Sequence, residues 1–453
     1  TVGSNSCFFQ RHAPGTMMRL LWLTSLQAAL SVKSVPRFDI DFDKPPQERY
    51  RAIHEYFRES SLAMMKSTKQ NLAAHFSEAE LANWTSVVKG LAGEETLREL
   101  EGILEALDLP DDDFDTLLLS NVLYELSSPT LGCSGVVAAN PQGQVYHGRN
   151  MDYRLEFKLP NGTVEDWPNV TYEAYYFKGG QPVFMSIGWA LYTGVHTGMR
   201  FGGWTFEQNT RPGNNATLNL AAGQKGGIPF GWFVKSLLAT VPDFQTALQK
   251  INSTSFMAPQ YFIMSGSQPY EGAVVSMDRL AAQSLPDTPP VRLLGPGSNW
   301  YLLQTNDDVN KLPADPRRPL TNMCLLWYKS EDVNLPNIWN LMLGPTLHDY
   351  LTVFTWVAIP STNYSKLALP GEPAPTSLLQ GQLTEPSSAP DEAAALRQML
   401  AVNGFAESSS ATLAERFMAH SLKKSPPLLG GNGKRWRHVV TDEGISLTHG
   451  DAM

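Results

Sequence analysis

The first part of the chain carries apolar residues at the spacing of amphipathic helices. Segments 49–69, 78–90 and 94–107 place apolar side chains three and four residues apart, and 117–126 is more continuously apolar. This spacing predicts helices that each bury one face. The acidic run 111–115 lacks the spacing of a calcium loop and is typical of a helix N-terminus, where carboxylates are favourable.

Beyond residue 133 the pattern changes to short strands. Strand-like runs lie at 170–177, 182–189, 261–265, 272–277, 300–307 and 350–359, and helical spacing returns at 230–239 and 243–251. A helical segment followed by mixed strands and helices predicts an α+β fold.

After residue 370 the character changes again. Residues 371–390 are rich in Pro, Ser and Gly, which is typical of a linker without fixed structure. Residues 391–402 have the spacing of a short helix, and basic side chains gather at Lys423, Lys424 and 434–437. We predict that 371–453 is a disordered extension, with its basic tail as a candidate for contact with anionic lipid.

The N-terminal residues have the pattern of a secretory signal. Met17, Met18 and Arg19 precede the apolar run 20–30, as the n-region precedes the h-region of a signal peptide. The run has 11 residues, fewer than a helix needs to span a bilayer. We predict an upstream or signal segment over 1–32 with cleavage near Ser31; the start of an ordinary amphipathic helix is the alternative.

Asn-x-Ser/Thr sequons support a secretory route, because they are acceptors of N-linked glycans in secreted proteins. The candidate sites are Asn83, Asn161, Asn169, Asn215, Asn252 and Asn363. Together with the candidate signal they predict a lysosomal or secreted protein.

Composition and missing motifs exclude several classes of protein. A chain of 453 residues can bury a sizeable core, and its net charge of −9 offers no basic surface for nucleic acid. Three cysteines are too few for a disulfide scaffold. The chain has no Cys-x-x-Cys, His-Glu-x-x-His, Walker or Gly-x-Gly-x-x-Gly pattern, so we predict neither a metal site nor a bound cofactor.

Candidate chemistry concentrates around Cys133. Arg149 and Asp152 follow it within 19 residues, so one thiol, one guanidinium and one carboxylate share a short segment. A cysteine acts as a nucleophile when a neighbouring group stabilises its thiolate or accepts its proton. The alternative is a core cysteine, because free thiols are among the most buried side chains.

A β-hairpin is predicted to bring these groups together. A turn sequence, Asn-Pro-Gln-Gly at 140–143, separates strand-like runs at 135–139 and 144–149. If the turn closes between its first and last residues, Cys133 lies opposite Asn150 and Asp152 shares its face. A bulge at Gly143 would shift the pairing by one residue and place Arg149 on that face instead. The sequence leaves both registers open.

The stretch 133–153 resembles the acid ceramidase and N-acylethanolamine-hydrolysing acid amidase family, which are N-terminal-nucleophile hydrolases of the cholylglycine-hydrolase type. Members carry a Cys, a short strand, a turn and then His-Gly-Arg-Asn-hydrophobe-Asp-aromatic, which stands here at 147–153. The similarity covers about residues 35–365. Further matching segments are 35–41, 205–207, 304–307, 315–318 and 323–325.

The resemblance implies an αββα sandwich with an N-terminal, mainly helical segment. It also implies a precursor that cuts itself between Gly132 and Cys133 into a helical α subunit, 33–132, and a catalytic β subunit, 133–370, which stay associated. The Cys133 thiol would attack the Gly132 carbonyl and water would release the thioester. The freed α-amine, with a reference pKa of about 7.7–8.0, would then serve as the base for a thiol of about 8.5.

The family motif assigns further roles by resemblance. Asp152 would hold the new ammonium or the thiol, and Arg149 would stabilise the thiolate or orient Asp152. Asn306 would donate an amide N–H into an oxyanion hole. Glu207 and Arg317 would set the local charge or the autocleavage water; for Arg317 a salt-bridged surface arginine is the alternative.

This chain departs from the family pattern at three places. Ser134 and Gly135 stand where the family has Thr-Ser, Gly132 stands where it has a bulky residue, and 315–318 reads Asp-Pro-Arg-Arg instead of Asp-Asp-Arg-Arg. These changes bear on substrate fit and processing rate, because no catalytic group is lost. Cys324 matches a family cysteine that can bridge the cleaved chains. No cysteine stands just before Val35, and Cys7, the one candidate partner, lies in the segment that is expected to be removed, so we expect Cys324 to be unpaired or a core residue.

The resemblance implies an amidase for N-acylated lipids. Ceramide is the leading substrate, a fatty-acid ethanolamide is the second, and a membrane surface or a lipid-transfer activator is a candidate partner. An acyl pocket is needed, for which the candidate lining residues are Trp189, Tyr192, Phe201 and Trp204. Two alternatives stay open: a non-catalytic secreted relative, and a penicillin- or bile-salt-type acylase, against which the long helical segment argues.

Overall fold

The computed structural model describes most of the chain between residues 35 and 370 and three strands near its C-terminus. The described residues are 35–126, 132–153, 155–280, 290–312, 314–344, 346–370, 428–429, 435–441 and 444–450. They fall into two compact units, Thr1–Asp308 with Tyr328–Gln382 and Val309–Trp327 with Leu383–Met453. The signal segment 1–32, the helix at 391–402 and the basic pair at 423–424 lie outside the described residues.

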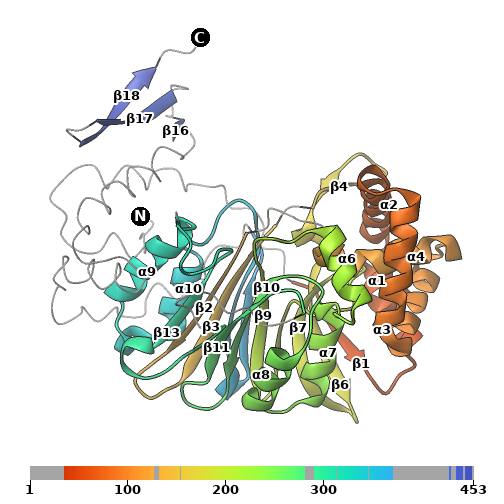
Figure 1. The fold of residues 1–453 in the computed structure, drawn as a ribbon, viewed down its shortest axis with the longest axis horizontal. Coiled ribbons are helices and arrows are strands. Elements are labelled where there is room, and N and C mark those ends of the chain that lie inside the picture. Colours follow the sequence, from red (N-terminus) through yellow and green to blue (C-terminus); the bar gives the residue numbers. More distant parts are fainter. Residues whose placement is uncertain are drawn as a thin grey trace. The chain divides into compact units, whose positions relative to one another are not determined.

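The N-terminal segment folds as the predicted set of helices (Figure 1). They are α1 (Arg51–Tyr56), α2 (Arg58–His75), α3 (Glu78–Leu107), α4 (Phe114–Ser120) and α5 (Leu123–Leu126). Ser77 and Glu80 form a capping box at the start of α3. Gly93, with a φ of 73°, kinks α3 between the two helices that the sequence predicts. The acidic run forms a 3-10 turn, Asp111–Asp113, which leads into α4 as expected.

Two sheets form the rest of the first unit. The five-stranded sheet has the order β13 (Tyr301–Gln304), β2 (Gly132–Ala139), β3 (Val145–Asp152), β14 (Thr352–Ile359) and β15 (Tyr364–Ala368). The eight-stranded sheet has the order β1 (Arg37–Asp41), β6 (Thr171–Lys178), β7 (Gln181–Trp189), β8 (Thr197–Arg200), β9 (Trp204–Thr210), β10 (Gln260–Gly266), β11 (Gly272–Met277) and β12 (Val291–Leu293). The N-terminal strand β1 pairs in parallel with β6, so the segment before residue 133 extends the sheet that follows it.

The sheets pack face to face between helices (Figure 1). A buried apolar cluster joins their inner faces and includes Val137, Val145, Tyr261, Ile263 and Val274. The eight-stranded sheet is covered by α7 (Phe230–Thr240) on β7 and β8 and by α8 (Phe244–Ser253) on β10 and β11, while α10 (Leu335–Met342) packs on β3 and β14. The α+β fold and its αββα order of layers are confirmed.

Some elements differ from the sequence-based expectation. β13 ends at Gln304 rather than near residue 307, because the chain turns there: the Gln304 side chain donates to the carbonyls of Thr305 and Asp307 at 3.1 and 2.9 Å. The second unit contains a helix that the sequence analysis missed, α9 (Arg317–Trp327).

The second unit also contains a small antiparallel sheet within the extension 371–453. Its strands are β16 (Leu428–Leu429), β17 (Arg435–Thr441) and β18 (Gly444–Gly450). The rest of that extension lies outside the described residues, so its disorder stays a prediction. Among the helices that the structure describes, none is long and apolar enough to cross a bilayer.

Candidate active site

The turn at 140–143 decides the register of the β2–β3 hairpin. Gly143 adopts a φ of 82°, its N–H donates to the Asn140 carbonyl at 2.8 Å, and the Asn140 N–H donates to the Gln144 carbonyl at 3.1 Å. This is a turn followed by a glycine bulge. Cys133 therefore pairs with Met151, so Arg149 lies diagonally on the same face as Cys133. Of the two registers that the sequence left open, the bulged one is found.

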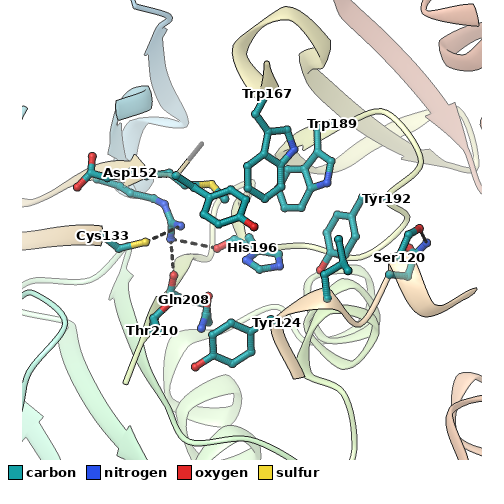
Figure 2. Close-up of a pocket in the computed structure, with 15 residues that line it drawn as sticks. Ser120, Tyr124, Cys133, Asp152, Trp167, Trp189, Tyr192, His196, Gln208 and Thr210 are labelled. Carbon is teal, nitrogen blue, oxygen red and sulfur yellow. Dashed lines mark hydrogen bonds between the residues drawn. The ribbon is translucent and has the colours of Figure 1, made fainter. Parts of the chain in front are cut away.

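Arg149 holds the sulfur of Cys133. Cys133 is a free thiol, 4% exposed, and the Arg149 Nη2 donates to its Sγ at 3.8 Å. The Arg149 Nη1 donates to the backbone carbonyls of Gln208 and His196 at 2.9 and 3.3 Å (Figure 2). One carbonyl on β9 and one just before β8 thus fix the guanidinium against the thiol, and its role toward a thiolate stays a prediction.

The charge balance around the thiol keeps it protonated. Burial raises the pKa of Cys133 to about 11; the Arg149 guanidinium lowers it, Asp152 and Glu207 raise it, and a hydrogen bond from the Asp152 backbone lowers it. Burial is the largest cause, so Arg149 alone does not produce a thiolate at neutral or acid pH. The thiol needs a base before it can act as a nucleophile.

Asn306 holds the backbone nitrogen of Cys133. The Cys133 N–H donates to the Asn306 Oδ1 at 2.6 Å, and the Asn306 Nδ2 donates to the Thr210 carbonyl at 3.0 Å. Asn306 therefore reaches Cys133 across 173 residues of sequence. Its amide N–H, which was expected to serve an oxyanion hole, is engaged by Thr210 in this uncleaved chain.

Asp152 lies one position along the hairpin, paired with Gly132. Its carboxylate is 1% exposed and accepts a hydrogen bond from the Thr352 hydroxyl at 2.8 Å. Its carboxylate is thus fixed near the candidate scissile bond, and its role towards the ammonium or the thiol stays a prediction.

Glu207 lies in the layer between the sheets, against the face of β2 that carries Cys133. Its Oε2 is 3.2 Å from the Nε2 of His147, and the His147 Nδ1 is 2.7 Å from the Thr205 hydroxyl. Its Oε1 is buried and has no hydrogen-bond partner among the described residues. A Cβ atom added to Gly135 would lie 2.0 Å from this oxygen, so the carboxylate covers β2 two residues after Cys133. The sequence analysis missed His147 as a partner of Glu207, although it stands in the family motif.

A pocket opens beside Cys133 and encloses about 570 Å³ of space between atoms, including the part open to solvent (Figure 2). It is lined by Ser120, Asn121, Leu123, Tyr124, Cys133, Arg149, Met151, Asp152, Tyr153, Trp167, Trp189, Tyr192, His196, Gln208 and Thr210. Trp189 stacks on Tyr192 with ring centroids 4.4 Å apart, and Trp167 meets Trp189 edge-on at 4.7 Å. One wall is therefore a continuous aromatic surface.

The pocket confirms half of the predicted lining residues. Trp189 and Tyr192 line it, whereas Trp204 is a core residue whose indole N–H donates to the Val241 carbonyl and Phe201 stacks on Tyr175. Phe201 and Trp204 follow Trp189 and Tyr192 in the same aromatic-rich stretch of sequence. That stretch does not reveal on which side of a strand each ring lies. Of the ten lining residues that sequence reasoning missed, four lie before residue 133, on α4, on α5 or between them: Ser120, Asn121, Leu123 and Tyr124.

Comparisons with known proteins agree with the motif. No family model matches the chain. It is 27% identical to acid ceramidase of Macaca fascicularis over 338 residues, which cover 71% of this chain and 82% of that protein. It is 26% identical to acid ceramidase of Homo sapiens over 340 residues, with the same coverage. It is 25% identical to N-acylethanolamine-hydrolyzing acid amidase of Caenorhabditis elegans over 332 residues, 71% of this chain and 88% of that protein.

The chain is therefore similar to the acid ceramidase and N-acylethanolamine-hydrolyzing acid amidase family, and these similarities support an amidohydrolase. Among solved structures, the Caenorhabditis elegans N-acylethanolamine-hydrolyzing acid amidase ortholog aligns with a TM-score of 0.44 at 25% identity, over 51% of this chain and 93% of that one. A mutant conjugated bile acid hydrolase from Clostridium perfringens aligns with a TM-score of 0.31 at 10% identity, over 52% and 89%.

Arg317, the last residue that the family motif suggested, lies in the second unit. There its Nη2 and Nε bind the Asp315 carboxylate at 2.7 and 3.1 Å. The geometry within this unit is that of a salt-bridged arginine, the alternative kept for it. Cys324, in the same unit, is disulfide-bonded to a partner outside the described residues. The expectation that it is unpaired was wrong, because it rested on the removal of Cys7, the one candidate partner in the sequence.

The candidate glycosylation sites are accessible to different degrees. Asn169 is half-buried, and the exposed ones are Asn83, Asn161, Asn215, Asn252 and Asn363. The Asn215 Oδ1 caps α6 (Ala216–Gln224) and the Asn363 Oδ1 accepts from the Gly202 N–H at 2.5 Å. Both bonds use the oxygen, so the nitrogen that would carry a glycan is left for modification.

Proposed function

We propose that this protein hydrolyses the amide bond of N-acylated lipids with Cys133 as an N-terminal nucleophile. The observation that carries the proposal is the arrangement at Cys133: Arg149 holds the sulfur, Asn306 holds the backbone nitrogen, and an aromatic pocket opens beside both. The relatives named acid ceramidase and acid amidase support the reaction class.

Activation would be a self-cleavage at Gly132. The thiol attacks the Gly132 carbonyl, the C–N bond to Cys133 breaks, and the thiol proton passes to the departing nitrogen. Water then hydrolyses the thioester, which frees the Gly132 carboxylate and regenerates the thiol. Glycine suits this step because it presents no side chain to the attacking sulfur. Glu207 would contribute a buried negative charge against β2, and a contribution from Arg317 remains part of the proposal.

Turnover would use the new α-amine as the base. It accepts the thiol proton, the thiolate attacks the acyl carbon of the lipid amide, and the amine of the substrate leaves with that proton. Water then hydrolyses the acyl-thioester and releases the fatty acid. The pKa of about 11 for the buried Cys133 thiol explains why a base within the same residue is needed.

Asn306 and Asp152 would orient the α-amine. Asn306 Oδ1 already accepts from this nitrogen at 2.6 Å, so it would direct one N–H and leave the lone pair for the thiol. Donation into an oxyanion hole by the Asn306 Nδ2 would require it to leave the Thr210 carbonyl after cleavage. Arg149 would stabilise the thiolate throughout.

Ceramide is the leading substrate and a fatty-acid ethanolamide the second, since relatives of both names match the chain. The aromatic wall of Trp167, Trp189 and Tyr192 would receive the acyl chain. The six sequons and the signal-like segment 1–32 support a lysosomal or secreted, glycosylated protein. A membrane surface or a lipid-transfer activator would deliver the lipid.

The cleaved chains would stay associated through buried polar contacts. Lys235 on α7 forms a buried ion pair with Glu99 on α3, and Asn214 donates to the Tyr124 carbonyl at 2.6 Å. These contacts join the segment before residue 133 to the one after it, and breaking a buried ion pair is costly.

The decisive experiment is intact mass and N-terminal sequencing after incubation of the secreted protein at pH 4.5, beside Cys133→Ala. A new chain that begins at Cys133 in the wild type alone is the expected result. A single uncut chain in both would favour a non-catalytic secreted relative. Assays with ceramide, palmitoylethanolamide and a conjugated bile salt then assign the substrate; turnover of the bile salt alone would contradict the lipid-amidase proposal.

A further inference from the structure

The chain segment that carries two rings of the aromatic wall contains a buried leucine in a backbone conformation that leucines rarely adopt. Leu191 is 1% exposed and has a φ of 71°, in the left-handed region that crowds any residue with a Cβ. Such strain persists only where the surrounding contacts enforce it. Leu191 lies between Trp189 and Tyr192, whose rings stack in the pocket (Figure 2). The contacts that hold Leu191 in this conformation therefore also fix the positions of the Trp189 and Tyr192 rings.

One enforcing contact comes from His54 on α1. The His54 Nε2 accepts the backbone N–H of Leu191 at 3.1 Å, and its Nδ1 lies 2.9 Å from the Tyr50 carbonyl. Because a carbonyl only accepts, Nδ1 carries the proton and Nε2 is the acceptor. The ring is fully buried, so water does not replace this bond.

The other enforcing contacts come from Asn121, which follows α4. Its Nδ2 donates to the Leu191 carbonyl at 2.8 Å, and its Oδ1 accepts from the N–H and the hydroxyl of Thr193 at 2.8 and 3.1 Å. Both backbone groups of Leu191 are therefore bound by side chains that precede residue 133. The peptide on either side of the strained residue has no freedom to relax.

The ring of Tyr192 packs closely against the backbone of two glycines. Cβ atoms added to Gly194 and Gly231 would lie 2.4 and 2.1 Å from its hydroxyl oxygen, so the ring fits against two bare backbones. If Leu191 relaxed to an ordinary conformation, the direction of Tyr192 would change and the ring would leave this fit. The stacking on Trp189 would be lost with it.

We propose that His54 and Asn121 are positioning residues that set the acyl selectivity of the pocket by holding Leu191 in its left-handed conformation. The inference rests on the proposed function, because it assigns the pocket to the acyl chain of an N-acylated lipid. The proposal gives the helical segment before residue 133 a role in substrate selection. Two of its side chains hold the backbone between Trp189 and Tyr192, whose rings lie in the part of the chain after residue 133. Neither residue touches the reacting atoms.

The test compares kcat/KM for N-palmitoyl and N-hexanoyl amides that share one amine. His54→Leu removes the acceptor, whereas His54→Gln places an amide oxygen near the position of Nε2. His75→Leu is the matched control, because the exposed His75 makes the same bond to a carbonyl four residues earlier, Asn71, at 2.8 Å and contacts no pocket wall.

We expect His54→Leu to change the palmitoyl-to-hexanoyl ratio by about fivefold or more, and His54→Gln and His75→Leu to stay within about twofold of the wild type. An unchanged ratio in His54→Leu, or an equal loss with both amides, would overturn the proposal. Asn121→Asp is a harsher second variant: it keeps the acceptor for Thr193, but it loses the donor to the carbonyls of Leu191 and Leu117 and places a buried carboxylate beside them.

A second experiment tests the hydrogen bonds to Leu191 without measuring hydrolysis of a substrate. In uncut Cys133→Ala protein, hydrogen exchange at the Leu191 amide is expected to be slow and to speed up about tenfold or more with His54→Leu but not with His75→Leu. If the wild type hydrolyses neither amide, the proposed function is wrong. The hydrogen-exchange experiment would still show whether the contacts of His54 hold Leu191 in place. Equal protection in all variants would show that they do not.

Discussion

At the scale of single residues, a buried carboxylate from the opposite sheet leaves no room for a side chain at Gly135 on β2. Gly135 faces Glu207, and an added Cβ would approach the carboxylate to 2.0 Å from one oxygen and 2.7 Å from its carbon. The carboxylate is buried and bound to His147, so it has little room to withdraw. The sequence analysis noted Gly135 only as a departure from the family pattern. The structure supplies its physical reason, which is the close approach of a buried side chain from the other sheet.

Gly135→Ala is therefore expected to destabilise the fold by about 1–3 kcal/mol through overpacking and to slow self-cleavage. Thermal unfolding in a Cys133→Ala background measures the stability term. Adding Glu207→Asp, which shortens the opposing side chain by one methylene, should recover part of the loss.

Gly90→Ala serves as the control, since an added Cβ on this exposed helix position meets nothing within 4 Å. That substitution is expected to be neutral or to stabilise by about 0.5–1 kcal/mol. Equal effects of the two alanines would show that the contact with Glu207 does not matter.

At the scale of elements, the sequence predicts the type of most helices and strands but not how strands align. The turn 140–143 and the order of Cys133, Arg149 and Asp152 were readable from the sequence. The face shared by the thiol was not, because one left-handed residue, Gly143, shifts every pair in the hairpin by one. Asn306 was placed at the site only through the family resemblance, since no local pattern links positions 173 residues apart.

The loop that carries Asn306 is fixed by a partly buried polar cluster that local sequence does not reveal. Arg211 binds the Asp308 carboxylate through Nε and Nη2 at 2.9 and 3.2 Å, and the Tyr261 hydroxyl donates to it at 2.6 Å. Arg211 follows Thr210, whose carbonyl accepts from Asn306. The cluster thus joins both segments that orient Asn306, the end of β9 and the turn after β13.

Tyr261→Phe is accordingly expected to slow self-cleavage several-fold while costing about 1 kcal/mol of stability, the usual effect of one lost hydrogen bond. Arg211→Met should lower both the rate of self-cleavage and the stability of the fold further, because it removes the ion pair with the Asp308 carboxylate. The control is Arg98→Met, which removes an exposed pair with Glu94 on α3 and should change stability by less than about 0.5 kcal/mol. Cleavage at the wild-type rate in Tyr261→Phe would show that the cluster does not position Asn306.

At the scale of the whole molecule, the segment before residue 133 carries two buried groups that respond to pH in opposite directions. Burial lowers the pKa of His54 to about 4, below its ordinary value of 6.5. As the pH falls from 6.5 towards 4, the unfolded chain binds this proton before the folded one does, so the fold loses stability over that window. His54 thus makes acid conditions unfavourable for the contact with Leu191.

Glu125 on α5 acts in the other direction. Burial raises its pKa from 4.5 to about 7, opposed in part by hydrogen bonds that include one from the Phe230 N–H at the start of α7, 3.2 Å from Oε1. Above pH 7 the carboxylate is ionised in both states and the fold carries the cost of burying it. As the pH falls from 7 to 4.5 the folded chain takes up the proton first, so stability rises over that window. The joint between α5 and α7 is therefore suited to an acidic compartment.

Glu125→Gln tests this joint, because an amide keeps the oxygen that accepts from Phe230 and cannot ionise. In the Cys133→Ala background the variant is expected to unfold at a higher temperature than its parent at pH 7.5, by a free-energy difference on the order of 3 kcal/mol, and at nearly the same temperature at pH 4.5. Glu101→Gln, at an exposed position of α3, should shift neither midpoint. A shift of the same size for Glu125→Gln at both pH values would mean that its effect is packing rather than charge. The gain confined to neutral pH is what identifies a carboxylate that the fold tolerates only when it is protonated.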